Sequence, residues 1–358
     1  MLTFNFPFTA REMTEEVRLH PKRYGLVSAL GVFPLEAIPT TFVQITEDNG
    51  VINVLPAGER GGPGEQVERG RQNLKIFQIP HFPVEDVIRA LDLQDRKVVM
   101  NGQEVAANLP DELSKVLVEF GRRFAISAEY LRMSALKGVI KDGAGNTLTN
   151  LFTDFGVSQT EVDFVLGTST TDVQAKDEEL RGHIEDNLLG DTMDGVICLV
   201  SPEFFGKLIQ HDKITDLFKY TQDETRELRS LLAKKTGGLI GRVFNPFGGV
   251  TYVEYRASAP MKGGNERFIA ANDGYAYPTG TQSTFATFGG PADTLEEVND
   301  LPFVTEMDLQ DGTESFALPS FISAELKKHG KGVDLWGEMN ILPLCKQPKV
   351  LVKATTSN

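Results

Sequence analysis

The sequence has only two cysteines, Cys198 and Cys345, and they lie far apart in apolar stretches. A disulfide framework or a zinc site would need more ligands at closer spacing. We therefore expect both thiols to be buried as small apolar groups, in a protein suited to a reducing compartment. The first residues do not show the cationic region and apolar core of a signal peptide, so we expect none, and no apolar run comes near the roughly 18 residues needed to span a bilayer. These absences predict a soluble protein that is made in the cytoplasm.

The residues of a typical catalytic centre are also missing. None of the 5 histidines forms an HExxH-like pair or accompanies a glycine-flanked nucleophile. The glycines at 61–64 lack the lysine and hydroxyl of a phosphate loop, and those at 143–145 follow a predicted helix instead of opening one. We expect His81 to be a packed turn residue and Trp336, the sole tryptophan, to be a core or interface anchor. The sequence therefore predicts no enzyme, with no catalytic, cofactor-binding or metal-ligating residue.

The composition is that of a folded and strongly acidic protein. The chain has 358 residues, 41% of them hydrophobic, and a formal net charge of -14. A chain of this length can bury a sizeable core, and its apolar content argues against disorder. The negative charge repels phosphate backbones, so sequence-specific nucleic-acid binding is not expected.

The longest regular pattern runs over residues 111–141. Apolar residues recur there at steps of three and four, which predicts one buried face of an α-helix. Acidic residues at 111 and 112 suit its first turn, and Gly143 and Gly145 are expected to end it. At about 1.5 Å per residue this helix would be a rod of roughly 45 Å.

A long two-stranded excursion precedes the helix. Residues 41–46 and 72–79 have the patterns of strands, and a proline- and glycine-rich tip at 56–64 lies between them. A two-stranded ribbon alone is marginally stable in water, so we expect it to rest on another surface, as an interaction element of an assembly. The candidate assembly residues are Glu59, Arg60, Gly61, Gly62, Pro63, Gly64, Glu68, Arg69 and Arg71.

The other segments mix helix and strand signals. Residues 1–40 are rich in proline and read as an arm that borrows its order from other surfaces. Helices are expected at 180–189, 202–210 and 224–235, strands at 249–256 and 350–352, strands within 146–166, a small element at 84–93, and a central strand at 195–200. Residues 190–290 thus resemble an α/β unit.

Short motifs spread over almost the whole chain carry a resemblance to a known family. They lie at 40–43, 50–56, 60–64, 79–83, 90–94, 136–138, 268–269, 289–292 and 342–352. In their order and spacing the chain resembles the major capsid proteins of tailed bacteriophages, of the lambda-like gpE type. One departure lies at 95–97, where the family usually has a glycine-containing turn.

The resemblance implies an α+β Hong Kong 97-type capsid fold. Its expected parts are an N-terminal arm at 1–45, an extended loop or β-ribbon at 46–84, and a peripheral domain at 85–190 with its spine helix at 111–141. An axial domain at 191–299 and a return to the peripheral domain with a C-terminal strand at 300–358 complete it.

The resemblance also implies a function. The protein would be a major capsid protein that self-assembles into hexamers and pentamers of an icosahedral phage head, enclosing double-stranded DNA, and would reside in the virion capsid. Scaffold, portal, protease and decoration proteins are the implied partners, with no cofactor and no membrane. Two alternatives stay open: an encapsulin-like compartment shell, and a soluble enzyme whose site is assembled from distant residues.

Overall fold

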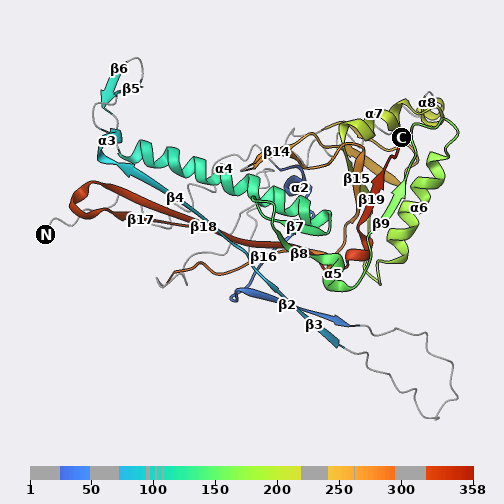
Figure 1. Ribbon diagram of the computed structural model, residues 1–358, viewed down its shortest axis with the longest axis horizontal. Helices are drawn as coiled ribbons and strands as arrows, with labels where there is room; N and C mark the ends of the chain where they lie inside the picture. The colour runs from blue at the N-terminus through green and yellow to red at the C-terminus, as the bar shows by residue number, and fades with distance from the viewer. Residues whose placement is uncertain are drawn as a thin grey trace, which may run out of the picture.

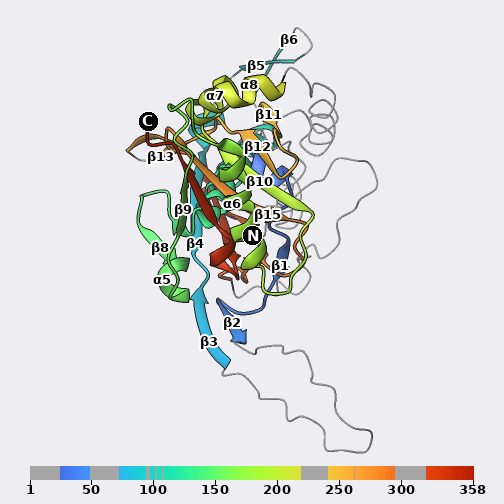
Figure 2. The same cartoon turned by 90° about the vertical axis from the view of Figure 1, so that its right-hand side faces the viewer.

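The protein is α+β, as expected, and is built around one long helix and two sheets (Figures 1 and 2). The structure is a computed structural model. It describes residues 25–48, 72–93, 97–100, 103–106, 109–218, 241–261, 263–294 and 320–358. In Figure 1 the long helix α4 lies lengthwise, the larger sheet lies beyond its C-terminal end, and the ribbon β2–β3 leaves the body below.

Helix α4 spans Leu109–Leu136, or about 42 Å at 1.5 Å per residue. Its apolar stripe is buried as predicted, and Asp111 and Glu112 lie in its first turn. The predicted end at 141 is wrong. Gly138 has a φ of 78°, and the Phe152 ring lies 2.1 Å from where a Cβ would stand at that position. A left-handed residue beside an aromatic ring ends the helix, and strand β7 (Val139–Lys141) follows.

The first sheet packs against α4. Its order is β1 (Leu35–Ala37), β16 (Phe285–Gly289), β18 (Gly332–Cys345) and β17 (Ser320–Leu326), and β4 (His81–Arg89) also pairs with β18. Gly337 of β18 permits the close approach, since a Cβ there would lie 2.8 Å from the Phe120 ring of α4. The 14-residue strand β18 is therefore the organising element of this sheet.

The second sheet has six strands, with β10 (Gly195–Val200) inside it as predicted. Its order is β11 (Val243–Phe244), β12 (Val250–Glu254), β10, β15 (Asp273–Thr279), β19 (Val352–Thr355) and β9 (Thr160–Asp163). The helices around it are α6 (Val173–Asp186), α7 (Pro202–Gln210) and α8 (Asp212–Phe218). Strands β9 and β19 come from segments on either side of residues 191–299.

Smaller elements complete the described chain. Two-stranded sheets are formed by β2 (Phe42–Asp48) with β3 (Gln72–Gln78), β5 (Lys97–Met100) with β6 (Gln103–Ala106), β7 with β8 (Thr147–Asn150), and β13 (Ser258–Met261) with β14 (Gly264–Arg267). Short helices are α2 (Leu26–Ala29), α3 (Ala90–Leu93) and α5 (Leu151–Phe155), with 3-10 turns at Lys328–Gly330 and Pro348–Val350.

Several predicted boundaries are corrected by the structure. The stretch 146–166 is not all strand, because Asn150 caps the helix α5 within it through the Thr153 N–H. The element expected at 84–93 is the end of β4 followed by α3. Helix α6 begins at Val173 and ends before 189, and the last strand begins only at Val352. The helix predicted at 224–235 lies outside the described residues.

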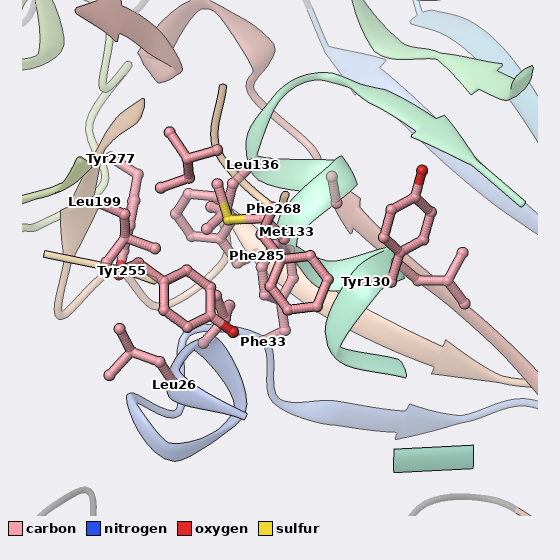
Figure 3. Close-up of a cluster of buried hydrophobic side chains, with 14 of the residues drawn as sticks. Leu26, Phe33, Tyr130, Met133, Leu136, Leu199, Tyr255, Phe268, Tyr277 and Phe285 are labelled. Atoms are coloured by element: carbon pink, nitrogen blue, oxygen red, sulfur yellow. The ribbon is translucent and has the colours of Figure 1, made fainter. Parts of the chain in front are cut away.

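The main core lies where the first described residues, helix α4 and both sheets meet (Figure 3). Leu26 of α2 enters this cluster, together with Met133 and Leu136 of α4. The Tyr277 and Phe285 rings, from different sheets, meet edge to face at 6.1 Å between centroids. The residues at 25–37 thus pack among elements from distant parts of the chain.

Candidate assembly surface

The ribbon β2–β3 has one buried and one exposed face. Phe42 pairs with Gln78 and Asp48 with Gln72, so side chains alternate between the two faces along both strands. Val43 and Phe77 are buried, at 4% and 5% exposure. Since these two residues are directly paired, they form the inner face, by which the ribbon rests on the body.

The base of the ribbon is fixed to α5. The rings of Phe77 and Phe155 stack with centroids 5.9 Å apart. Lys75 Nζ lies 4.2 Å from the centroid of Phe155 and donates a hydrogen bond of 2.7 Å to the carbonyl oxygen of Asp154. The base is therefore held by packing, by a cation–π contact and by a hydrogen bond.

The outer face of the ribbon exposes three large apolar side chains among polar ones. Phe42, Leu74 and Ile76 are 40%, 57% and 62% exposed. A shallow hollow of about 330 Å³ lies beside Ile76, between β3 and the segment of β8 and α5, and Leu148, 39% exposed, also lines it. Large exposed apolar groups gathered on one element indicate a contact surface.

The predicted assembly residues between Glu59 and Arg71 all lie outside the described residues. The structure instead shows Phe42, Leu74 and Ile76 exposed on the ribbon, and the sequence prediction of the assembly site does not include them. The signal was present in part, because residues 74 and 76, two positions apart on one strand, share a face whatever the strand pairs with. Sequence alone did not say which face rests on the body.

Comparison with known proteins shows the family of the chain. A family model for the phage major capsid protein E matches residues 9–356. The chain belongs to this family. It is thus a phage major capsid protein, a component of the virion capsid, as the resemblance implied.

Individual relatives agree with the family. The coat protein is 28% identical over 361 residues to the major capsid protein of Pseudomonas phage KPP10, which covers 98% of this chain and 96% of the relative. It is also 28% identical over 357 residues to the major capsid protein of Salmonella phage Felix O1, covering 96% and 95%.

The fold of the coat protein matches that of solved capsids. The capsid structure of cyanophage P-SCSP1u aligns with a TM-score of 0.52 at 12% identity, covering 100% of this chain and 93% of that chain. The expected Hong Kong 97-type fold is thereby confirmed. No helix within the described residues has the length and apolar character of a membrane span.

The two cysteines of the coat protein are packed in its interior. Cys198 and Cys345 are both buried free thiols, as predicted, and burial raises the pKa of Cys345 to about 12. Thiols at such a pKa are poor nucleophiles at neutral pH. Among the described residues, no group of three or more His, Cys, Asp or Glu side chains could hold a metal ion.

His81 was expected in a turn, which is wrong: it opens strand β4. Its Nδ1 lies 2.8 Å from Asn340 Oδ1, and its ring stacks on Trp336 with centroids 6.4 Å apart. Trp336 Nε1 donates to the buried carboxylate of Glu338 at 3.3 Å. Cross-strand pairing of β4 with β18 brings these polar groups together, so they stabilise the sheet of the coat protein.

Two acidic side chains are buried in the six-stranded sheet region. Burial raises the pKa of Asp177 to about 6, although its carboxylate accepts a 2.8 Å hydrogen bond from the Tyr252 hydroxyl. Burial also pushes the pKa of Glu254 upward, but hydrogen bonds from Arg242 and Arg256 hold it below its ordinary value. The ionised carboxylate of Asp177 therefore lowers the stability of the fold at neutral pH, whereas the charge of Glu254 is balanced by its two arginine partners.

Proposed function

We propose that this coat protein assembles head to tail into hexamers and pentamers, which close an icosahedral shell around double-stranded DNA. The observation that carries the proposal is the outer ribbon face of Phe42, Leu74 and Ile76, which the described part of the same chain leaves exposed. Rings form when two different surfaces of neighbouring subunits meet, and a protruding apolar ribbon supplies one of them. The membership in a family of capsid proteins supports the same reading.

In this proposal the ribbon lies over the next subunit. Burying an exposed Leu or Ile side chain contributes about 1 to 2 kcal/mol, so a few such residues repeated around a ring give a substantial contribution. The charged residues of the sequence-predicted assembly set, Glu59, Arg60, Glu68, Arg69 and Arg71, would form ion pairs across the same interface. Exposed ion pairs contribute little each, so apolar burial dominates.

The parts of the chain take distinct roles in the shell. Residues 1–45 act as the arm that ties neighbours together, and residues 46–84 form the extended loop. Residues 85–190 and 300–358 build the peripheral domain on α4, and residues 191–299 supply the axial domain at the centre of each ring. Support comes from the second sheet, whose strands β10, β11, β12 and β15 all lie within 191–299, while β19 and β9 from the flanking segments complete one edge.

Other components of the head are part of the proposal. A separate scaffold, a portal, a protease and a decoration protein would act with the coat protein. Its net charge of -14 would let packaged DNA move along the inner wall without being gripped.

Substitution on the ribbon face tests the proposal. Ile76→Ser should leave subunits folded and lower the yield of shells at least tenfold, as seen by electron microscopy and sedimentation, because it removes apolar area only from the exposed face. Gln44→Ser is the matched control, since Gln44 pairs directly with Ile76 on the partner strand and is polar. It should assemble like the parent.

A second variant addresses the tip. Deletion of residues 57–65 should leave soluble subunits that form few or no shells. Normal shells from both Ile76→Ser and the deletion would show that the ribbon takes no part in assembly. Shell loss in Gln44→Ser to the same extent as in Ile76→Ser would show that apolar burial is not the reason.

A further inference from the structure

A buried carboxylate stands where three parts of the coat protein meet. Glu129 of α4 is 0% exposed. Its oxygens accept hydrogen bonds from the Val27 N–H at 2.8 Å and the Ser28 N–H at 3.0 Å, both in α2. Tyr255 directly follows β12 of the six-stranded sheet, and its hydroxyl donates to Glu129 Oε1 at 2.7 Å. One side chain of the long helix thus holds both the arm and the axial sheet.

Ser28 connects this carboxylate to a buried cation. Its hydroxyl donates to Glu129 Oε2 at 2.7 Å and accepts from Arg132 Nη1. Arg132 is 4% exposed, and among the described residues its Nε has no hydrogen-bond partner. Burial lowers the pKa of Arg132, as expected for a cation removed from water. Within the described part of the chain, this guanidinium donates its hydrogen bond to Ser28 of α2, and the charge of Glu129 on its own helix attracts it.

Apolar side chains pack closely around Ser28, Glu129, Arg132 and Tyr255. Figure 3 shows Leu26 of the arm pointing into the same cluster as Tyr255 and Met133. The Tyr255 and Phe268 rings stack at 5.5 Å, and Phe268 lies 6.1 Å from the Tyr130 ring of α4. Apolar side chains from the arm, the helix and the axial region thus enclose the charges.

Removal of the arm would change the balance of this site. Three of the four hydrogen bonds to Glu129 come from Val27 and Ser28, so only that from Tyr255 would remain. Arg132 would lose its contact with Ser28 at the same time. Glu129 would keep Tyr255 and the attraction of Arg132. Buried charges with few hydrogen bonds are destabilising, so the present packing of α4 against the axial sheet is less favourable when the arm is not docked.

We propose that Ser28, Glu129, Arg132 and Tyr255 form a latch that couples the docking of the arm to the orientation of the axial sheet on α4. With Ser28 in place, the three parts are held in one arrangement. When the arm leaves, the axial sheet and helix separate or rotate until water reaches Glu129 and Arg132. The arm is then a switch for the shape of the subunit, which goes beyond a role as a tie between neighbours.

The test measures the shape of single chains. Spin labels are attached to cysteines that replace Arg123 on α4 and Glu178 on α6, both exposed. The native thiols are fully buried and do not compete for the label. Labelled full-length chains are kept in a large excess of unlabelled chain, so that only distances within one chain are recorded. The parent should give one narrow distance distribution.

Ser28→Ala should broaden or shift this distribution. It should also accelerate amide exchange about tenfold, both at residues 26–29 and at residues 250–257, because loss of one buried hydrogen bond at the junction loosens both partners. Tyr255→Phe, which acts from the axial side, should accelerate exchange in the same two regions. Ser127→Ala, a half-buried serine on α4 outside the latch, is the matched control and should match the parent.

An unchanged distance with faster exchange only at 26–29 in Ser28→Ala would overturn the proposal, since the arm would then be tethered without control over the axial sheet. No change in either measurement would overturn it as well. Neither measurement requires shells to form, so failure here is distinguishable from failure of the ribbon proposal.

Discussion

Asp177 should make the stability of this coat protein fall as the pH rises through the acidic range. Its side chain on α6 is 2% exposed and touches the sheet through Tyr252. There is no spare room beside it, since a Cβ at Gly249 would lie 2.8 Å from Asp177 Oδ2. An ionised carboxylate in this place is poorly solvated. Replacement of Asp177 by Asn keeps the shape and removes the charge.

The magnitude follows from the pKa difference. Burial raises the pKa of Asp177 from 3.8 to about 6. The folded state therefore binds the proton more tightly than the unfolded state does, so below pH 3.8 the side chain carries no penalty. The penalty grows as the pH rises from 3.8 to about 6 and is complete above it. Roughly two pKa units correspond to about 3 kcal/mol.

The assay compares the free energy of unfolding of unassembled Asp177→Asn and parent chains by urea titration at pH 4 and pH 7.5. The variant should gain up to about 3 kcal/mol relative to the parent between these two pH values. Glu325→Gln, at an exposed position of β17 away from this site, is the control and should show no such gain. A constant difference between Asp177→Asn and the parent at both pH values would refute the reasoning.

Two further predictions concern the core and the interface. Leu131→Ala, at a residue 1% exposed on α4, should lower the free energy of unfolding by about 2 to 5 kcal/mol, and Ala128→Pro should cost more because it also removes a helical hydrogen bond. Thermal melts within error of the parent for both variants would contradict the placement of this face in the core. Added sodium chloride should promote assembly or leave it unchanged, as followed by light scattering, because it screens repulsion between subunits of net charge -14. A steep loss of shells at moderate salt would instead show that ion pairs hold them together.

Periodic segments were predicted well because their signals are local. The apolar stripe of α4 repeats at three and four residues, and residues that far apart on a helix share a face whatever lies opposite. The strand β10 and the helix α7 were confirmed for the same reason, the latter with Ser201 capping its start and Pro202 in its first turn. The motifs spread along the chain led to the correct family, because their order and spacing are properties of sequence.

The candidate site was predicted only in part. The ribbon was recognised from its two strand patterns, and β2 and β3 do pair. Its exposed face was missed, because the choice between inside and outside depends on Phe155, far away in the sequence, which packs on Phe77. The junction of Ser28 with Glu129 was invisible for the same reason, as these residues are 101 positions apart.

The sequence by itself determined the class of the protein, its acidic surface, the long helix, the ribbon and the absence of a recognisable catalytic motif. Tertiary structure decided where α4 ends, because the Phe152 ring occupies the space beside Gly138. It also decided which distant strands join β10, since β9 and β19 enter its sheet from either side of residues 191–299. Local patterns follow from contacts between near neighbours in the chain, whereas the ends of elements, the faces they bury and the pKa of Asp177 depend on atoms that only folding brings together.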